Sequence, residues 1–205
     1  MTSKSHLLGR LPLDIDELRL RPLSRDDLDR GDNWPDYPEY YSPLNLKWRS
    51  LTEEQRDQAF SAMSSPNDSV TICVDLGESQ CIGIVSLHRI DWDAGFVADM
   101  GVRVRADLCD KGIGTTMMAG VVDWCFKSGI HRLSLAVCAL NPRAIRCYEK
   151  VGFTVVSEFW QDDAWWGAKS PQDPLRIQAE PHLQTEGDTT RVRFYRMETV
   201  TDSLQ

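Results

Sequence analysis

The sequence contains no apolar run long enough to cross a membrane. A membrane-spanning helix needs about 20 consecutive, mostly apolar residues, and no stretch of this 205-residue chain approaches that length. The first residues also lack the apolar core of a signal peptide. We therefore expect a cytoplasmic protein with no membrane partner.

The sequence also lacks the cysteine and histidine spacing of a metal site. Its six cysteines form no C-x-x-C pair and show no metal-ligand spacing with the four histidines. Such thiols are typical of buried, reduced side chains in a cytosolic protein. No metal is expected. Cys109 and Cys138 are not predicted to be nucleophiles, because no histidine stands at a suitable spacing from either.

Positive charge is scarce. The chain has 23 Lys and Arg residues against 31 Asp and Glu residues, which gives a net charge of −8. Nucleic-acid binding generally needs a basic face, so no nucleic-acid partner is expected. An acidic chain can steer a cationic substrate, but acidity also serves solubility and carries little weight here. The hydrophobic content of 41% is that of an ordinary globular protein.

Alternation, capping residues and turn residues outline the expected elements. Strands are predicted at 17–21, 70–74, 81–87, 96–104, 133–137, 153–156 and 193–198. Helices are predicted near 24–31 and 52–63, from 113 onward, and after Asn141.

Two glycines stand between a predicted strand and a predicted helix, at Gly112 and Gly114. Glycine allows a tight turn and a close approach of the backbone to a ligand. The first amides of a helix have no carbonyl partners and carry partial positive charge, so this position suits a phosphate. The spacing matches neither the P-loop nor the dinucleotide fingerprint. Alone, the pair favours an ordinary strand-to-helix turn.

A second motif, residues 141–153, changes that interpretation. Asn141 suits a helix cap and Pro142 the first helical position. Helical side chains lean toward the helix N-terminus, which aims Tyr148 back toward the end of the preceding strand. Gly152 suits the left-handed residue that ends a helix.

Together the two motifs resemble the GNAT superfamily of acyl-CoA-dependent N-acetyltransferases. Residues 109–114 are similar to its Q/R-x-x-G-x-G/A loop, and residues 141–153 are similar to its N-x-x-A-x-x-x-Y-x-x-x-G-F signature. The family usually carries Gln or Arg where this chain has Cys109, and often a small residue where it has Asp110. The resemblance is firm over residues 98–156.

The resemblance implies an α+β fold. The expected architecture is a mixed, mostly antiparallel central sheet of about seven strands, with helices on both faces and a splay between the fourth and fifth strands. Residues 17–205 are expected to form a single GNAT-like domain after a tail or lead-in at 1–16. Residues 161–190 fall outside the resemblance and are interpreted as an insertion.

The resemblance also implies direct transfer of an acetyl group from acetyl-CoA to a primary amine, on a small molecule or a peptide N-terminus. Tyr148 is the expected general acid, since a phenol of pKa ~10 can protonate a thiolate. Asp99 is the expected base, with a solvated strand residue as an equal alternative. Asn141 either binds the cofactor or only caps its helix. The other predicted cofactor-binding residues are Val102, Val104, Lys111, Gly112, Ile113, Gly114 and Thr115.

Three questions stay open at this point. Residues 32–50, rich in aromatics and prolines, either pack over the core or line the acceptor pocket. Residues 161–190 are either a surface excursion or a substrate lid or dimer contact, so a homodimer is left open. The alternative function is a catalytically silent acyl-CoA-binding sensor or structural module, which the departures at Cys109 and Asp110 keep in view.

Overall fold

The computed structural model describes residues 2–31, 33–45 and 48–201. This part of the chain forms a nine-stranded sheet in the order β1-β2-β3-β4-β5-β6-β9-β7, with β8 paired to β9. All neighbouring strands are antiparallel except β5 and β6, which are parallel. The strands are β1 (Leu13–Ile15), β2 (Leu18–Pro22), β3 (Val70–Leu76), β4 (Ser79–Asp91), β5 (Phe96–Val104), β6 (Arg132–Cys138), β7 (Thr154–Asp162), β8 (Leu183–Glu186) and β9 (Thr189–Val200).

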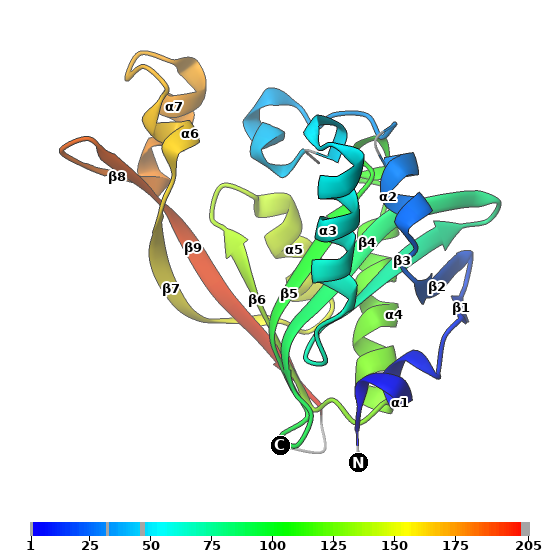
Figure 1. Ribbon diagram of the computed structural model, residues 1–205. Coiled ribbons are helices and arrows are strands. Elements are labelled where there is room, and N and C mark those ends of the chain that lie inside the picture. Colours follow the sequence, from blue (N-terminus) through cyan, green and yellow to red (C-terminus); the bar gives the residue numbers. More distant parts are fainter. Residues whose placement is uncertain (1, 32, 46–47, 202–205) are drawn as a thin grey trace.

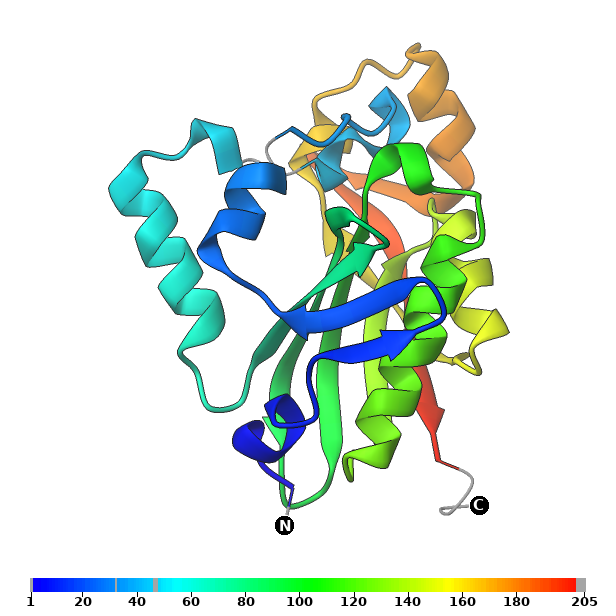
Figure 2. The same cartoon turned by 90° about the vertical axis from the view of Figure 1, so that its right-hand side faces the viewer.

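Helices cover both faces of the sheet, as expected. α2 and α3 lie on one side of β3, β4 and β5, and α4 and α5 lie on the other (Figures 1 and 2). None of the helices in the described ranges has the length and apolar character needed to cross a bilayer. The α-helices are α1 (Lys4–Leu8), α2 (Arg25–Gly31), α3 (Glu53–Ser64), α4 (Ile113–Lys127), α5 (Pro142–Lys150), α6 (Ala164–Gly167) and α7 (Pro174–Ala179). Short 3₁₀ helices are η1 (Glu39–Leu44), η2 (Trp48–Ser50), η3 (Ala106–Leu108) and η4 (Glu180–His182).

The splay predicted between the fourth and fifth strands lies between β5 and β6. These strands pair only at their first residues, Phe96 with Arg132 and Val97 with Leu133. Beyond this point they diverge, and Figure 1 shows the two arms of the sheet opening away from each other. The structure adds β1 and β8 to the seven expected strands.

The motifs that the sequence indicated form the expected local structures. Thr52 caps α3, and Gln55 returns the interaction in a capping box. The Asn141 side chain accepts a hydrogen bond of 3.1 Å from the amide of Ala144 and caps α5. Gly152 ends that helix with φ of +91°. Helix caps and helix-ending glycines depend on a few neighbouring residues, so they could be predicted without knowledge of the tertiary fold.

Residues 4–15 form α1 and β1 and pack on the domain. Leu7 is completely buried in the main core. Ile15 lies so close to α4 that a Cβ added at Gly120 would stand 2.2 Å from its Cδ1 atom. The segment expected as a tail or lead-in therefore contributes to the core.

The segment at 161–190 is also packed. It begins inside β7, which continues to Asp162, and it goes on through α6, α7, η4 and β8. A second, smaller core holds it against the sheet, with Trp166, Ala179, Leu140 and Val192 buried. Its aromatic residues thus face inward onto β9 and the end of β6.

Candidate active site

A cavity of about 530 Å³ opens between β5 and β6. Both strands of the splay, the first turn of α4 and one face of α5 supply its walls, and η1 and the segment after β7 supply the rest. Seven of the ten predicted site residues line it: Val102, Val104, Gly112, Gly114, Thr115, Asn141 and Tyr148. The structure therefore brings both sequence motifs to one place.

The N-terminal end of α4 is open to this cavity. Gly112 is its N-cap with φ of +82°, and a Cβ added there would meet no atom within 4 Å. The amides of Thr115 and Thr116 both donate to the Gly112 carbonyl, at 2.9 and 3.1 Å. In the described part of the chain, the amides of Ile113 and Gly114 donate to no acceptor. Unpaired amides and the helix dipole make this end suitable for an anion.

The charges around this end are mostly positive. Asp110 is paired with Arg143 at 3.5 Å, so its carboxylate is neutralised beside the glycine turn. Arg143, Arg146 and Lys150 line the cavity from α5. Arg146 and Lys150, which are in no ion pair among the described residues, and the free helix end together suit a ligand with several negative charges.

Tyr148 lies against the core at the edge of the cavity. Its residue is 9% exposed, and its ring packs on Phe153 with centroids 5.9 Å apart. Burial raises the pKa of Tyr148 well above its ordinary value. The phenol therefore keeps its proton at neutral pH, and the same burial makes it a weaker acid than a free phenol.

The aromatic segment after α2 serves both roles that the sequence left open. Tyr37, Tyr40 and Tyr41 line the cavity. Trp48 instead is buried and donates a hydrogen bond of 2.8 Å to Asp29. Residues 32, 46 and 47 of this segment lie outside the described residues.

Tyr37 also touches the exposed edge of β5. Its hydroxyl donates a short hydrogen bond to the carbonyl of Val104. Burial raises the pKa of Tyr37 to about 12, so this donor stays protonated. The guanidinium of Arg143 lies over its ring at 5.8 Å and over the ring of Tyr41 at 5.0 Å. These contacts hold the aromatic segment over the cleft.

Three predicted residues are not among the described residues that line the cavity. Ile113 packs into the main core. Lys111 belongs to the glycine turn just outside the lining. Asp99 pairs with Arg89 at 3.6 Å, and its register places it on the face of β5 opposite to Met100 and Val102.

The sequence left open a substrate lid in the segment after β7, but it did not single out the residues there that line the cavity. Asp163, Trp166 and Phe194 line the cavity. The Asp163 side chain caps α6 by accepting the amides of Trp165 and Trp166, at 2.9 and 3.0 Å. An aspartate just before a short helical segment is a recognisable N-cap signal. The cap alone does not show that α6 folds back over the cavity.

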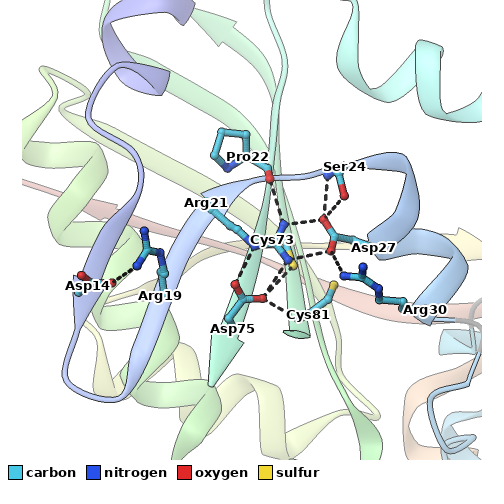
Figure 3. A network of polar contacts seen from close by, with 10 residues as sticks. All are labelled: Asp14, Arg19, Arg21, Pro22, Ser24, Asp27, Arg30, Cys73, Asp75 and Cys81. Atoms are coloured by element: carbon cyan, nitrogen blue, oxygen red, sulfur yellow. Dashed lines mark hydrogen bonds and ion pairs between the residues drawn. The ribbon is translucent and has the colours of Figure 1, made fainter. Parts of the chain in front are cut away.

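A second cluster of ionisable groups lies elsewhere, between β2, β3 and α2. Candidate ligand atoms of Asp27, Cys73 and Cys81 all lie within 4.8 Å of one another, and all three residues are buried. Figure 3 shows Arg21 seated between Asp27 and Asp75. Its guanidinium donates to Asp27 at 2.6 and 2.7 Å and to Asp75 at 2.7 and 3.0 Å.

The hydrogen-bond acceptors of this cluster are already in use. The Asp27 carboxylate also accepts the amide and hydroxyl of Ser24, at 2.8 and 2.7 Å. Asp75 accepts the amide of Cys81 at 2.7 Å. A hydrogen bond with Cys81 and burial raise the pKa of Cys73, which keeps the thiol protonated. The cluster is therefore a structural network rather than a second active site.

Comparisons with known proteins agree with this geometry. The family model for the acetyltransferase (GNAT) family matches residues 28–153. No match was found among curated protein sequences.

Solved structures share the fold at low sequence identity. The spermidine N-acetyltransferase from Vibrio cholerae in complex with CoA and spermine is 18% identical, with a TM-score of 0.65, over 90% of this chain and 95% of that chain. A chimera of SpeG from Vibrio cholerae and hSSAT is 18% identical, with a TM-score of 0.66, over 90% and 96% of the two chains. A GNAT acetyltransferase from Streptococcus pneumoniae is 18% identical, with a TM-score of 0.56, over 90% and 100%.

Proposed function

The chain belongs to the GNAT acetyltransferase family, and from this premise we propose that it transfers an acetyl group from acetyl-CoA to a small-molecule primary amine in a ternary complex. One observation supports this most directly. The open N-terminal end of α4 and the buried phenol of Tyr148 lie on the same cavity. An anion site and a proton donor are the two parts that this chemistry needs.

The diphosphate of CoA would bind at the start of α4. Gly112, Gly114 and Thr115 line the cavity together with Arg143, Arg146 and Lys150, and the amides of Ile113 and Gly114 have no acceptor among the described residues. The pantetheine arm would then follow β5, where the backbone of Val102 and Val104 has no strand partner on the β6 side within the described residues. An extended ligand can pair with such a strand edge. The pairing of Asp110 with Arg143 lessens the repulsion between its carboxylate and the diphosphate.

Transfer needs a neutral amine and a protonated leaving group. The amine lone pair forms a bond to the thioester carbonyl carbon, and the carbon–sulfur bond breaks with its electrons on sulfur. Tyr148 donates its proton to the departing thiolate. The amine loses a proton to water, or to Asp99 if that residue acts as the base. This proton is then passed to the tyrosinate and restores the phenol of Tyr148. Asp99 stays a prediction, since it pairs with Arg89 outside the cavity lining.

The acceptor is proposed to be a small molecule. The Vibrio cholerae relative was crystallised with spermine, which makes amines of this kind the first to test. The division into a lead-in, one domain and an insertion at 161–190, and the cytoplasmic location, remain parts of the proposal. The alternative, a silent acyl-CoA-binding module, predicts cofactor binding without turnover.

Release of free CoA thiol from acetyl-CoA, measured against a panel of primary amines, tests the proposal. Acceptor-dependent release is expected, and tight acetyl-CoA binding in calorimetry without release from any amine would favour the silent module. Tyr148→Phe should lower kcat about 100-fold and leave the acetyl-CoA dissociation constant within about two-fold, since the ring is kept. Tyr195→Phe is the control, because that tyrosine packs on the main core from β9. Unchanged turnover in Tyr148→Phe across the pH range would remove Tyr148 from the mechanism.

A further inference from the structure

The cavity has a second end, remote from Tyr148. Tyr148 contacts Phe153, which directly precedes β7, and Asp163 directly follows β7. A strand of nine residues spans about 30 Å at ~3.3 Å per residue. In Figure 1, β7 runs from the closed end of the splay up to α6. Tyr148, which packs on the residue before β7, and Asp163, which follows β7, both line the cavity, so the cavity extends along the sheet between them.

Aromatic rings form the walls of this second end. Tyr40 meets Trp166 at 5.7 Å with the rings 73° apart, and it meets Tyr41 at 5.1 Å with the rings 81° apart. Rings set nearly at right angles enclose a corner. The face of an aromatic ring attracts a cation. The guanidinium of Arg143 already lies over the ring of Tyr41 at 5.0 Å, whereas no cation of the described residues lies over Tyr40 or Trp166. We refer to Tyr40, Tyr41 and Trp166 as the aromatic corner.

A carboxylate stands beside the aromatic corner. The Oδ1 atom of Asp163 accepts the two amides of α6, but its Oδ2 atom has no partner in the part of the chain that the structure describes. The charge of Asp163 reaches Cys138 and contributes, after burial, to raising the pKa of that thiol. Asp163 and the three rings of the aromatic corner all line the cavity.

Other nearby charges are already paired. Of the carboxylates on described residues that line the cavity, Asp110 is engaged by Arg143, which leaves Asp163. Glu39 pairs with Lys169 at 3.0 Å, and Lys169 also pairs with Asp173 at 3.3 Å. The Glu39–Lys169 pair ties η1 to the segment after β7, so both halves of the corner are held together.

We propose that the aromatic corner and Asp163 form a distal subsite for a second positive charge on the acceptor. This inference rests on the proposed function, because it assumes that a reacting amine lies near Tyr148. The acceptor class is then an α,ω-diamine or polyamine whose far ammonium group is remote from the reacting amine. A monoamine would leave the Asp163 charge unpaired and would gain only apolar contacts.

The test compares diamines with monoamines of matched length. Each α,ω-diamine of three to twelve methylenes is assayed beside the corresponding n-alkylamine, and the ratio of their kcat/KM values is measured in the full-length protein. At the best chain length we expect a ratio of about ten or more in favour of the diamine.

Asp163→Asn should bring this ratio close to one. Asparagine caps helices as well as aspartate does, so α6 should persist while the charge is lost. Asp162→Asn is the matched control, because that neighbouring carboxylate pairs with Arg191 and is 72% exposed. The control should keep the ratio, and neither variant should change acetyl-CoA affinity by more than about two-fold.

Two results would overturn the subsite. One is a diamine-to-monoamine ratio of kcat/KM of one or less at every chain length in the unchanged protein, which would mean that the aromatic corner binds an apolar group. The other is a ratio that Asp163→Asn leaves intact. If no amine releases CoA thiol, the proposed function fails, and the subsite is then judged by calorimetry in the presence of CoA. Diamine binding lost in Asp163→Asn would support it, and equal or absent binding of diamine and monoamine would refute it.

Discussion

Two clusters of ionisable side chains lie on the same sheet and differ in how far their hydrogen-bonding groups are satisfied. In the Arg21 network between β2, β3 and α2, Arg21 is held by Asp27 and Asp75, and those carboxylates accept further donors (Figure 3). In the cavity between β5 and β6, amides at the start of α4 and an oxygen of Asp163 have no partner in the described part of the chain.

The difference separates a structural cluster from a functional one better than residue type does. Two cysteines and a buried carboxylate within 4.8 Å resemble a metal site by composition. Their donors and acceptors are nevertheless matched within the protein, so little is left to bind a ligand. The groups that line the cavity are less buried than those of the Arg21 network, and fewer of their charges are paired. Polar groups without a partner gain most from binding a ligand.

The largest effect is expected from breaking the Arg21 network. Arg21→Met would leave Asp27, which is fully buried, without its guanidinium partner. Removing one partner of a buried ion pair typically costs about 3–5 kcal/mol. Urea denaturation should show a loss of that order in the free energy of unfolding, while calorimetry on the folded protein shows unchanged acetyl-CoA affinity.

Arg19→Met is the control for that experiment. Arg19 lies two residues away on the same strand, and its pair with Asp14 is 3.7 Å long between side chains that are 53% and 74% exposed. Exposed pairs contribute about 0–1 kcal/mol. Equal losses in the two variants would contradict the view that the Arg21 network stabilises the fold.

The next largest effect is expected at the glycine turn. Gly112→Val places a branched side chain in the open space at the start of α4, where the φ of +82° already disfavours it. We expect acetyl-CoA affinity to fall about 100-fold or more, since the side chain would exclude a phosphate from the amides.

Gly187→Val separates steric exclusion from backbone strain. Gly187 also has positive φ, at +57°, and also faces open space, but it lies in the turn between β8 and β9. Both variants should lose a similar amount of stability, and only Gly112→Val should lose acetyl-CoA binding. Retained affinity in Gly112→Val would mean that the phosphates bind elsewhere.

The sequence predicted the parts of this fold whose signals are local. The glycine turn and the Asn141 cap each specify their own backbone geometry within a few residues. The order of elements then brought both motifs to the splay. The Arg21 network could not be predicted, because it joins Arg21 to Asp75 across 54 residues. Asp163 was missed for the same reason, since its position in the cavity depends on how α6 packs against η1.

A third prediction concerns the acid stability of the Arg21 network. Burial of Asp27 would raise its pKa, but hydrogen bonds from Arg21 and Ser24 outweigh this and lower it below the ordinary value. A lowered pKa stabilises the fold above the unfolded pKa, and this contribution is lost as pH falls through the folded pKa. The free energy of unfolding should therefore fall as pH drops from about 5 to about 2.

Asp27→Asn should be less stable than the unchanged protein at pH 7 and show a shallower fall with acid. The effect is smaller than that of Arg21→Met, because asparagine keeps an acceptor for Ser24. Urea denaturation at several pH values measures both quantities. Parallel curves for the two proteins would show that Asp27 does not carry the acid response.

The smallest effect is expected at the hydrogen bond from Tyr37 to Val104, which occupies the unpaired edge of β5 in the cavity. Tyr37→Phe removes the hydrogen bond to the Val104 carbonyl and keeps the ring beneath Arg143. A neutral hydrogen bond contributes about 0.5–1.5 kcal/mol net. If the pantetheine arm binds along β5, freeing this carbonyl should tighten acetyl-CoA binding about two- to five-fold, as measured by calorimetry. Tyr41→Phe is the control, since its ring also lies under Arg143 and the bond to Val104 comes from Tyr37 instead. Weaker binding in Tyr37→Phe would show instead that this hydroxyl contacts the cofactor. In that case the aromatic segment would form part of the cofactor-binding surface and would not compete with the pantetheine arm for the edge of β5.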